Sequence, residues 1–291
     1  MPGLHSTSWL KEWRILGDKW APWIVALVAL AAGTGCGEAQ HIDPAASEKV
    51  YQLGAQLFQQ GQYRPALEEL LRATKLNPQN ADALYLLGII ALREASDGEE
   101  MMSGETCLQA QDAALMKDEI ESNFRKAEER FKQVLVIKPE FSEAWNGLAV
   151  VQLHFQRWSE VIATELKALG SPTYATPWMA QGNLGWAYLN RKELPLAAKE
   201  LRESVFANPR FCVGRYRLGK VYYEEKNFEG AAEELEKVSS DPKCAIQEAQ
   251  HLLGLVSLKR GDRARAESAF KACVDLHPKS CLARECRIAA P

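Results

Sequence analysis

The chain has 291 residues, of which 47% are hydrophobic and 25% are charged, and its 35 Lys and Arg against 38 Asp and Glu give a formal net charge of -3. This composition is typical of a folded globular chain and excludes a disordered or collagen-like protein. The composition also argues against nucleic acid as a partner, because positive charge is not in excess.

The N-terminus has the features of a signal peptide over residues 1–35. Basic residues precede an apolar run of twelve residues from Ala21 to Ala32, which is too short to span a membrane. Residues 33–35 are small and lead directly into Cys36, and the polar stretch 37–43 follows. The chain is therefore expected to be exported.

The order of these features resembles the lipobox of bacterial lipoproteins, in which a small residue precedes the cysteine that is acylated and becomes the new N-terminus. The resemblance implies that a lipidated Cys36 holds the chain on a membrane through a tether over residues 36–46. Gly33 stands where the lipobox usually has Leu. An uncleaved N-terminal anchor, or ordinary cleavage with a free cysteine nearby, therefore stays open as the alternative.

A leucine followed by a small residue recurs through the rest of the chain with a period near 34 residues. The pairs are Leu53-Gly54, Leu87-Gly88, Leu148-Ala149, Leu184-Gly185, Leu218-Gly219 and Leu253-Gly254. A small or short residue twelve positions later is expected to receive the close approach of a second helix, and a proline closes each unit because it cannot continue a helix. This pattern resembles the tetratricopeptide repeat.

The resemblance implies an all-α superhelix of about six helical hairpins followed by a C-terminal capping helix. The predicted hairpins cover residues 47–80, 81–141, 142–175, 178–211, 212–245 and 247–280, and the cap covers 281–291.

The second unit is 27 residues longer than one repeat, because it contains an acidic insertion over residues 95–121. We predict a loop around Gly98 and Gly104 and then an early start of the second helix. The apolar residues at helical spacing there are Leu108, Leu115, Met116, Ile120 and Phe124. The insertion is either a solvated charged helix without a partner or a docking arm for a partner subunit.

Six cysteines lie beyond Cys36, and export permits disulfides among them. They are Cys107, Cys212, Cys244, Cys273, Cys281 and Cys286. Cys212 opens the first helix of the fifth unit and Cys244 follows its second helix, so the hairpin brings the two to one edge and predicts a bridge.

Cys273 can reach either Cys281 or Cys286 after the turn at Pro278, and we favour Cys281. A zinc site made of Cys273, His277, Cys281 and Cys286 is the alternative. It is disfavoured, because Pro278 interrupts the helix that would align these ligands and oxidising conditions favour disulfides.

No nucleophile motif, phosphate-binding glycine loop or strand pattern is present in the sequence. We therefore expect a protein that is not an enzyme, with no cofactor, no metal and no small-molecule substrate.

In the tetratricopeptide family, positions 2, 5, 9, 12 and 13 of each first helix face a concave groove. In this sequence the groove positions give the candidate partner-binding residues Tyr51, Phe58, Tyr85, Ile89, Leu92, Val150, Leu153, Trp186, Leu189, Tyr216, Tyr223, Leu255 and Leu258. Such a surface favours a hydrophobic or amphipathic protein segment, whereas Arg93, Lys220 and Lys259 are too dispersed to clamp an acidic peptide. Part of this stripe could instead be core between successive repeats.

A lipidated cysteine followed by six such repeats resembles the type IV pilus biogenesis lipoproteins, the pilotins PilF, PilW and Tgl, over residues 36 to about 288. The cysteines in the last repeats are most similar to the Tgl branch of gliding bacteria. The resemblance implies an outer-membrane lipoprotein on the periplasmic face that binds secretin subunits and promotes their assembly into multimers for pilus-dependent motility. A general periplasmic scaffold that organises outer-membrane or cell-wall assembly machinery is the alternative.

Overall fold

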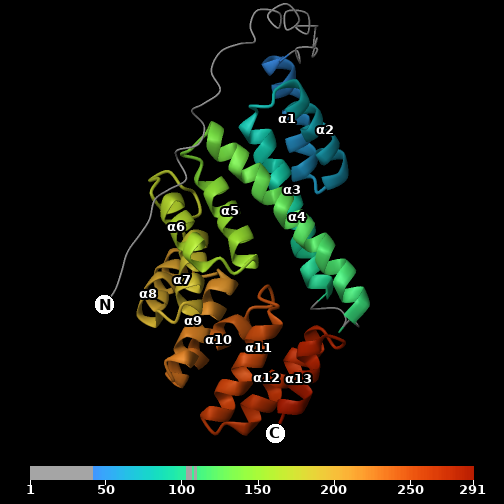
Figure 1. The fold of residues 1–291 in the computed structure, drawn as a ribbon. Helices are drawn as coiled ribbons and strands as arrows, with labels where there is room; N and C mark the ends of the chain where they lie inside the picture. Colours follow the sequence, from blue (N-terminus) through green and yellow to red (C-terminus); the bar gives the residue numbers. More distant parts are fainter. Residues whose placement is uncertain (1–41, 103–106, 108–109) are drawn as a thin grey trace, which may run out of the picture. The chain divides into compact units, whose positions relative to one another are not determined.

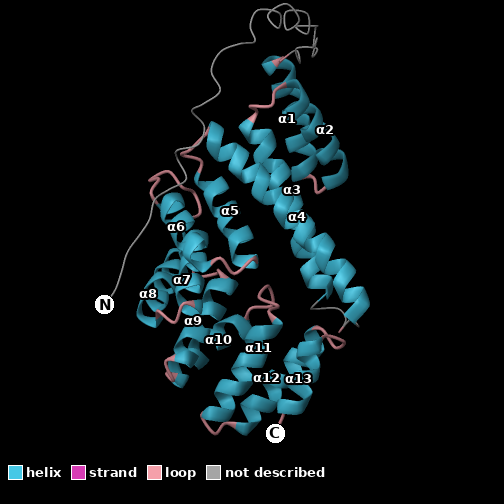
Figure 2. Cartoon of the chain, in the orientation of Figure 1, coloured by secondary structure: helices cyan, strands magenta, loops and turns pink. Residues whose placement is uncertain are grey.

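The computed structural model describes residues 42–102, 107 and 110–291, and these form thirteen α-helices and no strand (Figure 1, Figure 2). The predicted signal peptide 1–35, the lipidation site Cys36 and the tether as far as residue 41 lie outside the described residues. No described helix combines the length and the apolar character that a membrane span requires.

The helices follow one another along the chain with short connections. They are α1 Pro44–Gln59, α2 Tyr63–Leu76, α3 Ala81–Glu100, α4 Ala110–Ile137, α5 Ser142–His154, α6 Trp158–Leu169, α7 Pro177–Asn190, α8 Leu194–Ala207, α9 Cys212–Glu224, α10 Phe228–Ser240, α11 Gln247–Lys259, α12 Arg263–Leu276 and α13 Cys281–Ala289. Each odd-numbered helix up to α11 pairs with the next helix as a hairpin and also packs on the neighbouring hairpin, and α13 covers α12. The predicted tetratricopeptide-repeat fold is confirmed.

Helices within a hairpin interlock through a glycine on the first helix and a bulky residue sixteen positions later on the second. The pairs are Gly54 with Leu70, Gly185 with Leu201, Gly219 with Leu235 and Gly254 with Phe270. A Cβ on Gly185 would lie 2.5 Å from Cγ of Leu201 and 3.2 Å from the carbonyl oxygen of Ala197. The glycine of the first helix therefore lies closest to the bulky residue of the second helix. The small residue twelve positions after the glycine is farther from it.

Phe131 of α4 makes this contact in two directions. Its ring lies against Gly88 of its own hairpin and against Gly147 of the next, where an added Cβ would come within 2.7 Å and 2.6 Å of ring atoms. The side chain is fully buried. Phe131 therefore couples the second hairpin to the third.

The turn between the two helices of most hairpins uses one residue with positive φ. Gly61 and Gly261 supply it in the first and last hairpins, with φ of 76° and 79°. Gln156, Lys192 and Lys226 adopt it in the third, fourth and fifth hairpins, a conformation that is uncommon for residues with a side chain.

The first helix begins three residues before the predicted repeat. Pro44 occupies the first turn, where its missing N–H is not needed, and the Asp43 carboxylate accepts a hydrogen bond from the Ala46 amide at 2.9 Å. The Asp43 amide also donates to the Leu76 carbonyl at the end of α2. The end of the predicted tether 36–46 is thus part of the first hairpin.

The insertion of the second unit lengthens both helices of that hairpin, so α3 has 20 residues and α4 has 28. The prediction of a loop around Gly98 is wrong, because Gly98 lies inside α3, where the absence of a side chain lets Ile120 of α4 approach closely. Ile120 and Phe124 are buried between the helices, whereas Leu115 is 75% exposed. Gly104 and Leu108 lie outside the described residues.

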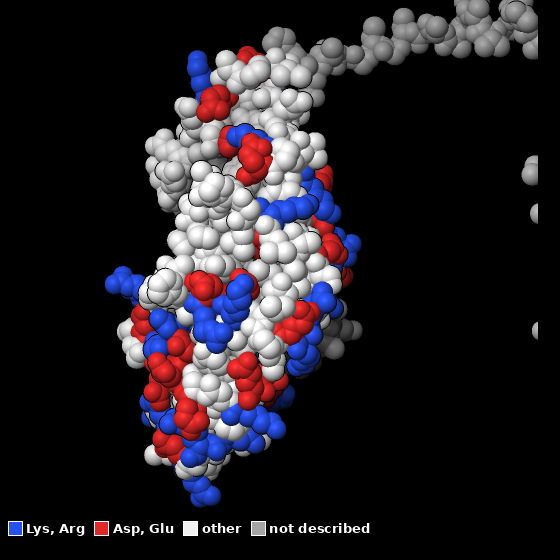
Figure 3. All heavy atoms as spheres, turned by 90° about the vertical axis from the view of Figure 1, so that its left-hand side faces the viewer, with Lys and Arg blue, Asp and Glu red and all other residues white. Residues whose placement is uncertain are grey.

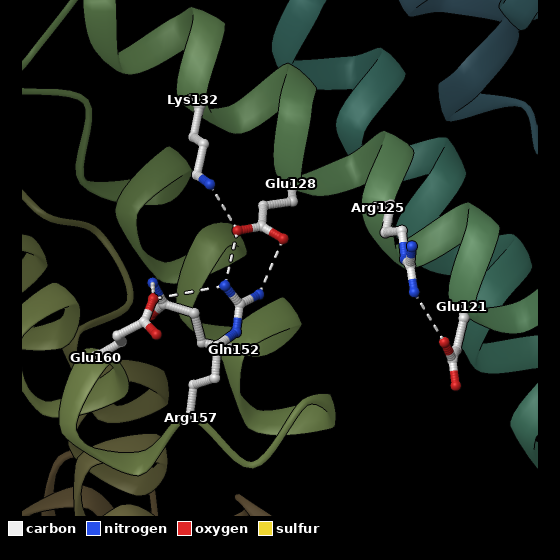
Figure 4. Close-up of polar contacts among 7 residues, drawn as sticks. All are labelled: Glu121, Arg125, Glu128, Lys132, Gln152, Arg157 and Glu160. Carbon is white, nitrogen blue, oxygen red and sulfur yellow. Dashed lines mark hydrogen bonds and ion pairs between the residues drawn. The ribbon is translucent and has the colours of Figure 1, made fainter.

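An ion network fixes the middle of α4 to the turn between α5 and α6 (Figure 4). Both guanidinium Nη atoms of Arg157 donate to the Glu128 carboxylate at 2.9 Å, and Lys132 lies 2.7 Å from the same carboxylate. The hydrogen bond from Arg157 lowers the pKa of Glu128. Bidentate pairs of this kind are among the stronger polar contacts in proteins.

The face of the molecule drawn in Figure 3 carries charged side chains of both signs.

Replacing the ring shared by two hairpins should destabilise the whole array. We expect Phe131→Ala to lower the free energy of unfolding by about 3–5 kcal/mol, because it leaves a cavity that two glycine-bearing helices cannot fill. Urea denaturation followed by circular dichroism measures this loss. Phe206→Ala, at a side chain that is 84% exposed, is the control and should change the same quantity by less than about 0.5 kcal/mol. Equal losses in the two variants would contradict the coupling.

Candidate functional site

The structure places most of the predicted groove residues as the outer layer of the core. Ten of them are partly buried and pack against buried clusters: Tyr51, Phe58, Tyr85, Ile89, Leu92, Leu153, Trp186, Tyr216, Tyr223 and Leu255. Val150 is also partly buried, and Leu258 is 36% exposed. The stripe is therefore shared between the core and the surface.

Leu189 is a correction to that set. Its side chain is only 3% exposed and lies in a buried cluster with Leu201 of α8 and Leu218 of α9. It points between helices instead of into the groove, so a ligand in the groove cannot reach it.

The middle of the stripe is aromatic and carries one cation. The ring centroids of Trp186 on α7 and Tyr216 on α9 are 6.3 Å apart, and the Arg217 guanidinium lies 5.3 Å from the Trp186 centroid. Burial raises the pKa of Tyr216 to about 12, so its hydroxyl keeps its proton at neutral pH. This part of the surface can pack an apolar side chain and offer hydrogen-bond donors beside it.

A polar network lies beneath the aromatic pair and joins four helices. The Asn183 amide of α7 donates to Glu165 of α6 at 2.8 Å and to Asn146 of α5 at 3.2 Å. Arg217 of α9 donates through one Nη to the side-chain oxygen of Asn183 at 2.9 Å and to the Gly182 carbonyl at 3.0 Å. The network holds Asn146 and Arg217 in place across three repeats.

Glu165 occupies a position that is apolar in every other hairpin. It lies sixteen residues after Ala149, where the other units have Leu70, Phe131, Leu201, Leu235 and Phe270. Glu165 is fully buried, and its Oε2 has no hydrogen-bond partner within the described part of the chain. The single carboxyl at a repeated apolar position is the signal in the sequence that could have located this network.

Burial raises the pKa of Glu165 to about 8, although the hydrogen bond from Asn183 and the charge of Arg217 act in the opposite direction. Burial likewise lowers the pKa of Arg217 to about 10, which leaves the guanidinium charged at neutral pH. Glu165 is therefore mainly protonated at pH 7, and Arg217 is the charged member of the network.

The structure joins six cysteines in three disulfides. Cys212 is bonded to Cys244, the pair that the hairpin geometry predicts. Cys273 is bonded to Cys286, so the expected partner Cys281 is wrong. The physical reason is that Cys273 and Cys286 are both fully buried between α12 and α13, whereas Cys281 opens α13 and is only partly buried.

Cys281 is bonded instead to Cys107 of the acidic insertion, 174 residues earlier in the chain. The Cys107 amide also donates to the Lys279 carbonyl at 3.1 Å. The insertion therefore contacts the C-terminal cap of its own chain through Cys107. It is not a helix without a partner, and at this contact it is not free to bind another subunit.

All three cysteines of the alternative zinc site are consumed by these bridges. Over the described residues, no group of three or more His, Cys, Asp or Glu side chains is placed to hold a metal ion.

The buried carboxyl makes a prediction about pH. Because the pKa of Glu165 is about 8 in the folded chain and 4.5 for an ordinary glutamate, the folded state binds more protons between these values, and stability falls as the pH rises through this window. Glu165→Gln cannot ionise. Its stability relative to the wild type should therefore increase, by on the order of a few kcal/mol, between about pH 5 and pH 8.

Urea denaturation at the two pH values measures this difference. Glu203→Gln, at an exposed position of α8, is the matched control and should follow the wild type at both. A Glu165→Gln variant that also follows the wild type would contradict the elevated pKa.

Comparisons with known proteins agree with this geometry. Family models for the tetratricopeptide repeat match residues 54–93, 121–177 and 248–280. The chain is similar to the crystal structure of PilW, described as a widely conserved type IV pilus biogenesis factor, with 22% identity and a TM-score of 0.64 over 84% of this chain and 99% of that one. It is also similar to PilF of Pseudomonas aeruginosa, with 18% identity and a TM-score of 0.63 over 84% of this chain and 97% of that one. No curated protein sequence gives a significant match.

Proposed function

We propose that this tetratricopeptide-repeat protein, which has the fold of PilW and PilF, acts in type IV pilus biogenesis as a scaffold that binds a protein partner. The observation that carries the proposal is that the similarity extends over 99% of the PilW chain, so it includes the whole PilW array and not one shared hairpin. Tetratricopeptide arrays serve many partners, so the assignment to pili rests on this extended match.

The proposed partner is a secretin subunit. The partly exposed stripe around Trp186 and Tyr216 suits an apolar segment of an unassembled subunit, and Arg217 and Asn146 suit the polar main chain of such a segment. Covering the segment would prevent aggregation until subunits associate into the multimer. No covalent bond changes in this role.

The proposed location is the periplasmic face of the outer membrane. Acylation of Cys36 would anchor the chain there, because each buried methylene of the acyl chains contributes about 0.8 kcal/mol to membrane binding. The anchor would concentrate the complex at the membrane where the secretin assembles.

Charge introduced into the aromatic pair should abolish the function. We expect Trp186→Glu combined with Tyr216→Glu to remove secretin multimers, because large aromatic anchors contribute much of the energy of such interfaces. Phe206→Glu, on the exposed surface of α8, is the control and should leave the multimers unchanged. Both aromatic residues also pack on the core, so circular dichroism and the melting temperature must show that the double variant is folded. A folded double variant with normal multimers would contradict binding at this stripe.

The heat-resistant secretin multimer, measured on a denaturing gel, tests the proposal as a whole. We expect a deletion strain to lack the multimer and a Cys36→Ala strain to form less of it, because an unlipidated chain is not concentrated at the membrane. Unchanged multimers in the deletion strain would overturn the proposal. The general envelope scaffold would then be the better account, and the machinery recovered with the protein would identify it.

A further inference from the structure

A cleft lies between the C-terminal end of α3 and the C-terminal end of the array. It has a volume of about 790 Å³. One wall comes from the end of α3, and the other comes from the start of α11 and from α13. None of the groove residues around Trp186 lines it.

The two walls are joined by the Cys107–Cys281 disulfide, and Cys281 itself lines the cleft. The hydrogen bond from the Cys107 amide to the Lys279 carbonyl adds a second link beside it. The cleft therefore exists because the insertion reaches the cap, and a regular repeat in that place would leave one wall missing.

The floor of the cleft is apolar and its rim is acidic. Met102, Ile246 and Leu282 are partly buried and pack against the cores of three different parts of the array. The rim carries four carboxylates, Glu99, Glu100, Glu248 and Glu285, while His277 is the sole basic side chain among the lining residues that are described.

Three of these four carboxylates have no ion pair within the described part of the chain. Glu99 pairs with His154 at 2.7 Å. Glu100, Glu248 and Glu285 form no ion pair with any described residue, and all three are exposed. The cleft thus combines apolar contact area with an excess of negative charge.

We propose that this cleft binds an extended protein segment in which apolar side chains alternate with Lys or Arg. Apolar side chains of the segment would cover Met102, Ile246 and Leu282, and its basic groups would reach the carboxylates of the rim. Among the described residues, no group of three or more His, Cys, Asp or Glu side chains is placed to hold a metal ion, so the proposed ligand is not a metal. The proposal rests on the proposed function only in that the ligand is a protein segment.

Fluorescence anisotropy with the purified full-length chain tests the proposal. The probes are two short labelled peptides of equal length, one alternating Leu with Lys and the other alternating Leu with Glu. We expect the Lys peptide to bind and the Glu peptide not to bind, and we expect added salt to weaken binding. Equal binding of the two peptides would overturn the charge complementarity.

Matched variants locate the binding. Glu100→Gln combined with Glu285→Gln should weaken binding of the Lys peptide by about tenfold or more and reduce its dependence on salt. Glu225→Gln combined with Glu267→Gln removes the same charge from exposed positions at the end of α9 and on α12, outside the cleft, and should leave binding unchanged. If both double variants bind alike, the peptide binds somewhere else and the proposed site is wrong.

Removal of the bridge tests its role in holding the walls. Cys107→Ser with Cys281→Ser should weaken binding of the Lys peptide by about fivefold or more, because the walls must then be ordered on binding. Cys212→Ser with Cys244→Ser removes a bridge that does not line the cleft and is the control. Wild-type affinity in the first variant, with its fold verified by circular dichroism, would show that the bridge does not position the walls.

The two proposals fail separately. Trp186→Glu alone changes no lining residue of the cleft, and Trp186 packs against a different buried cluster from the apolar residues of the cleft, so this variant should bind the Lys peptide normally. Peptide binding that survives while secretin multimers do not depend on the protein would leave the cleft in place and overturn only the assignment to pili.

Discussion

A bulky side chain pressed against a helix that has no Cβ at the point of contact is the interaction on which the array depends. It sets the spacing of the two helices in a hairpin, and in Phe131 it also sets the spacing between hairpins, since the ring meets Gly88 on one side and Gly147 on the other. Because each interlock is local, the array can lengthen one hairpin greatly without losing the others. The acidic insertion uses this freedom.

Glu165 is the exception to this rule, and it belongs to the polar network that Arg217 connects to Trp186. Where five other hairpins bury a leucine or phenylalanine, this one buries a carboxyl whose pKa is raised by the same burial. A buried polar group costs free energy unless it is fully hydrogen-bonded, and one oxygen of this carboxyl has no partner among the described residues. The buried carboxyl thus lowers the stability of the fold. In return, its hydrogen bond orders a set of polar side chains that reaches the surface of three repeats, namely Asn146, Asn183 and Arg217.

The repeat period alone predicts the hairpins, because glycine, leucine and proline recur at positions whose packing is local. Long-range features are not predictable in this way. The partner of Cys273 depends on which side of α13 faces α12, and the contact of Cys107 with the cap depends on how the whole array curves. Leu189 shows the same limit within one helix, since a family position marks it as groove while its own neighbours bury it. Gly98 is a further case, because spacing cannot distinguish a glycine that makes a turn from one that admits Ile120.

The bridge between Cys107 and Cys281 also determines how the chain carries mechanical load. A force applied to the two ends passes directly through this bond and does not stretch the 174 residues of sequence separation that it spans. At 3.3–3.6 Å per extended residue, about 600 Å of chain is shielded from tension. Only the residues before Cys107 and after Cys281 can then be drawn out. Reduction of this bond would expose most of the remaining length to the force, although the Cys212–Cys244 and Cys273–Cys286 bridges would still hold back the residues between their cysteines.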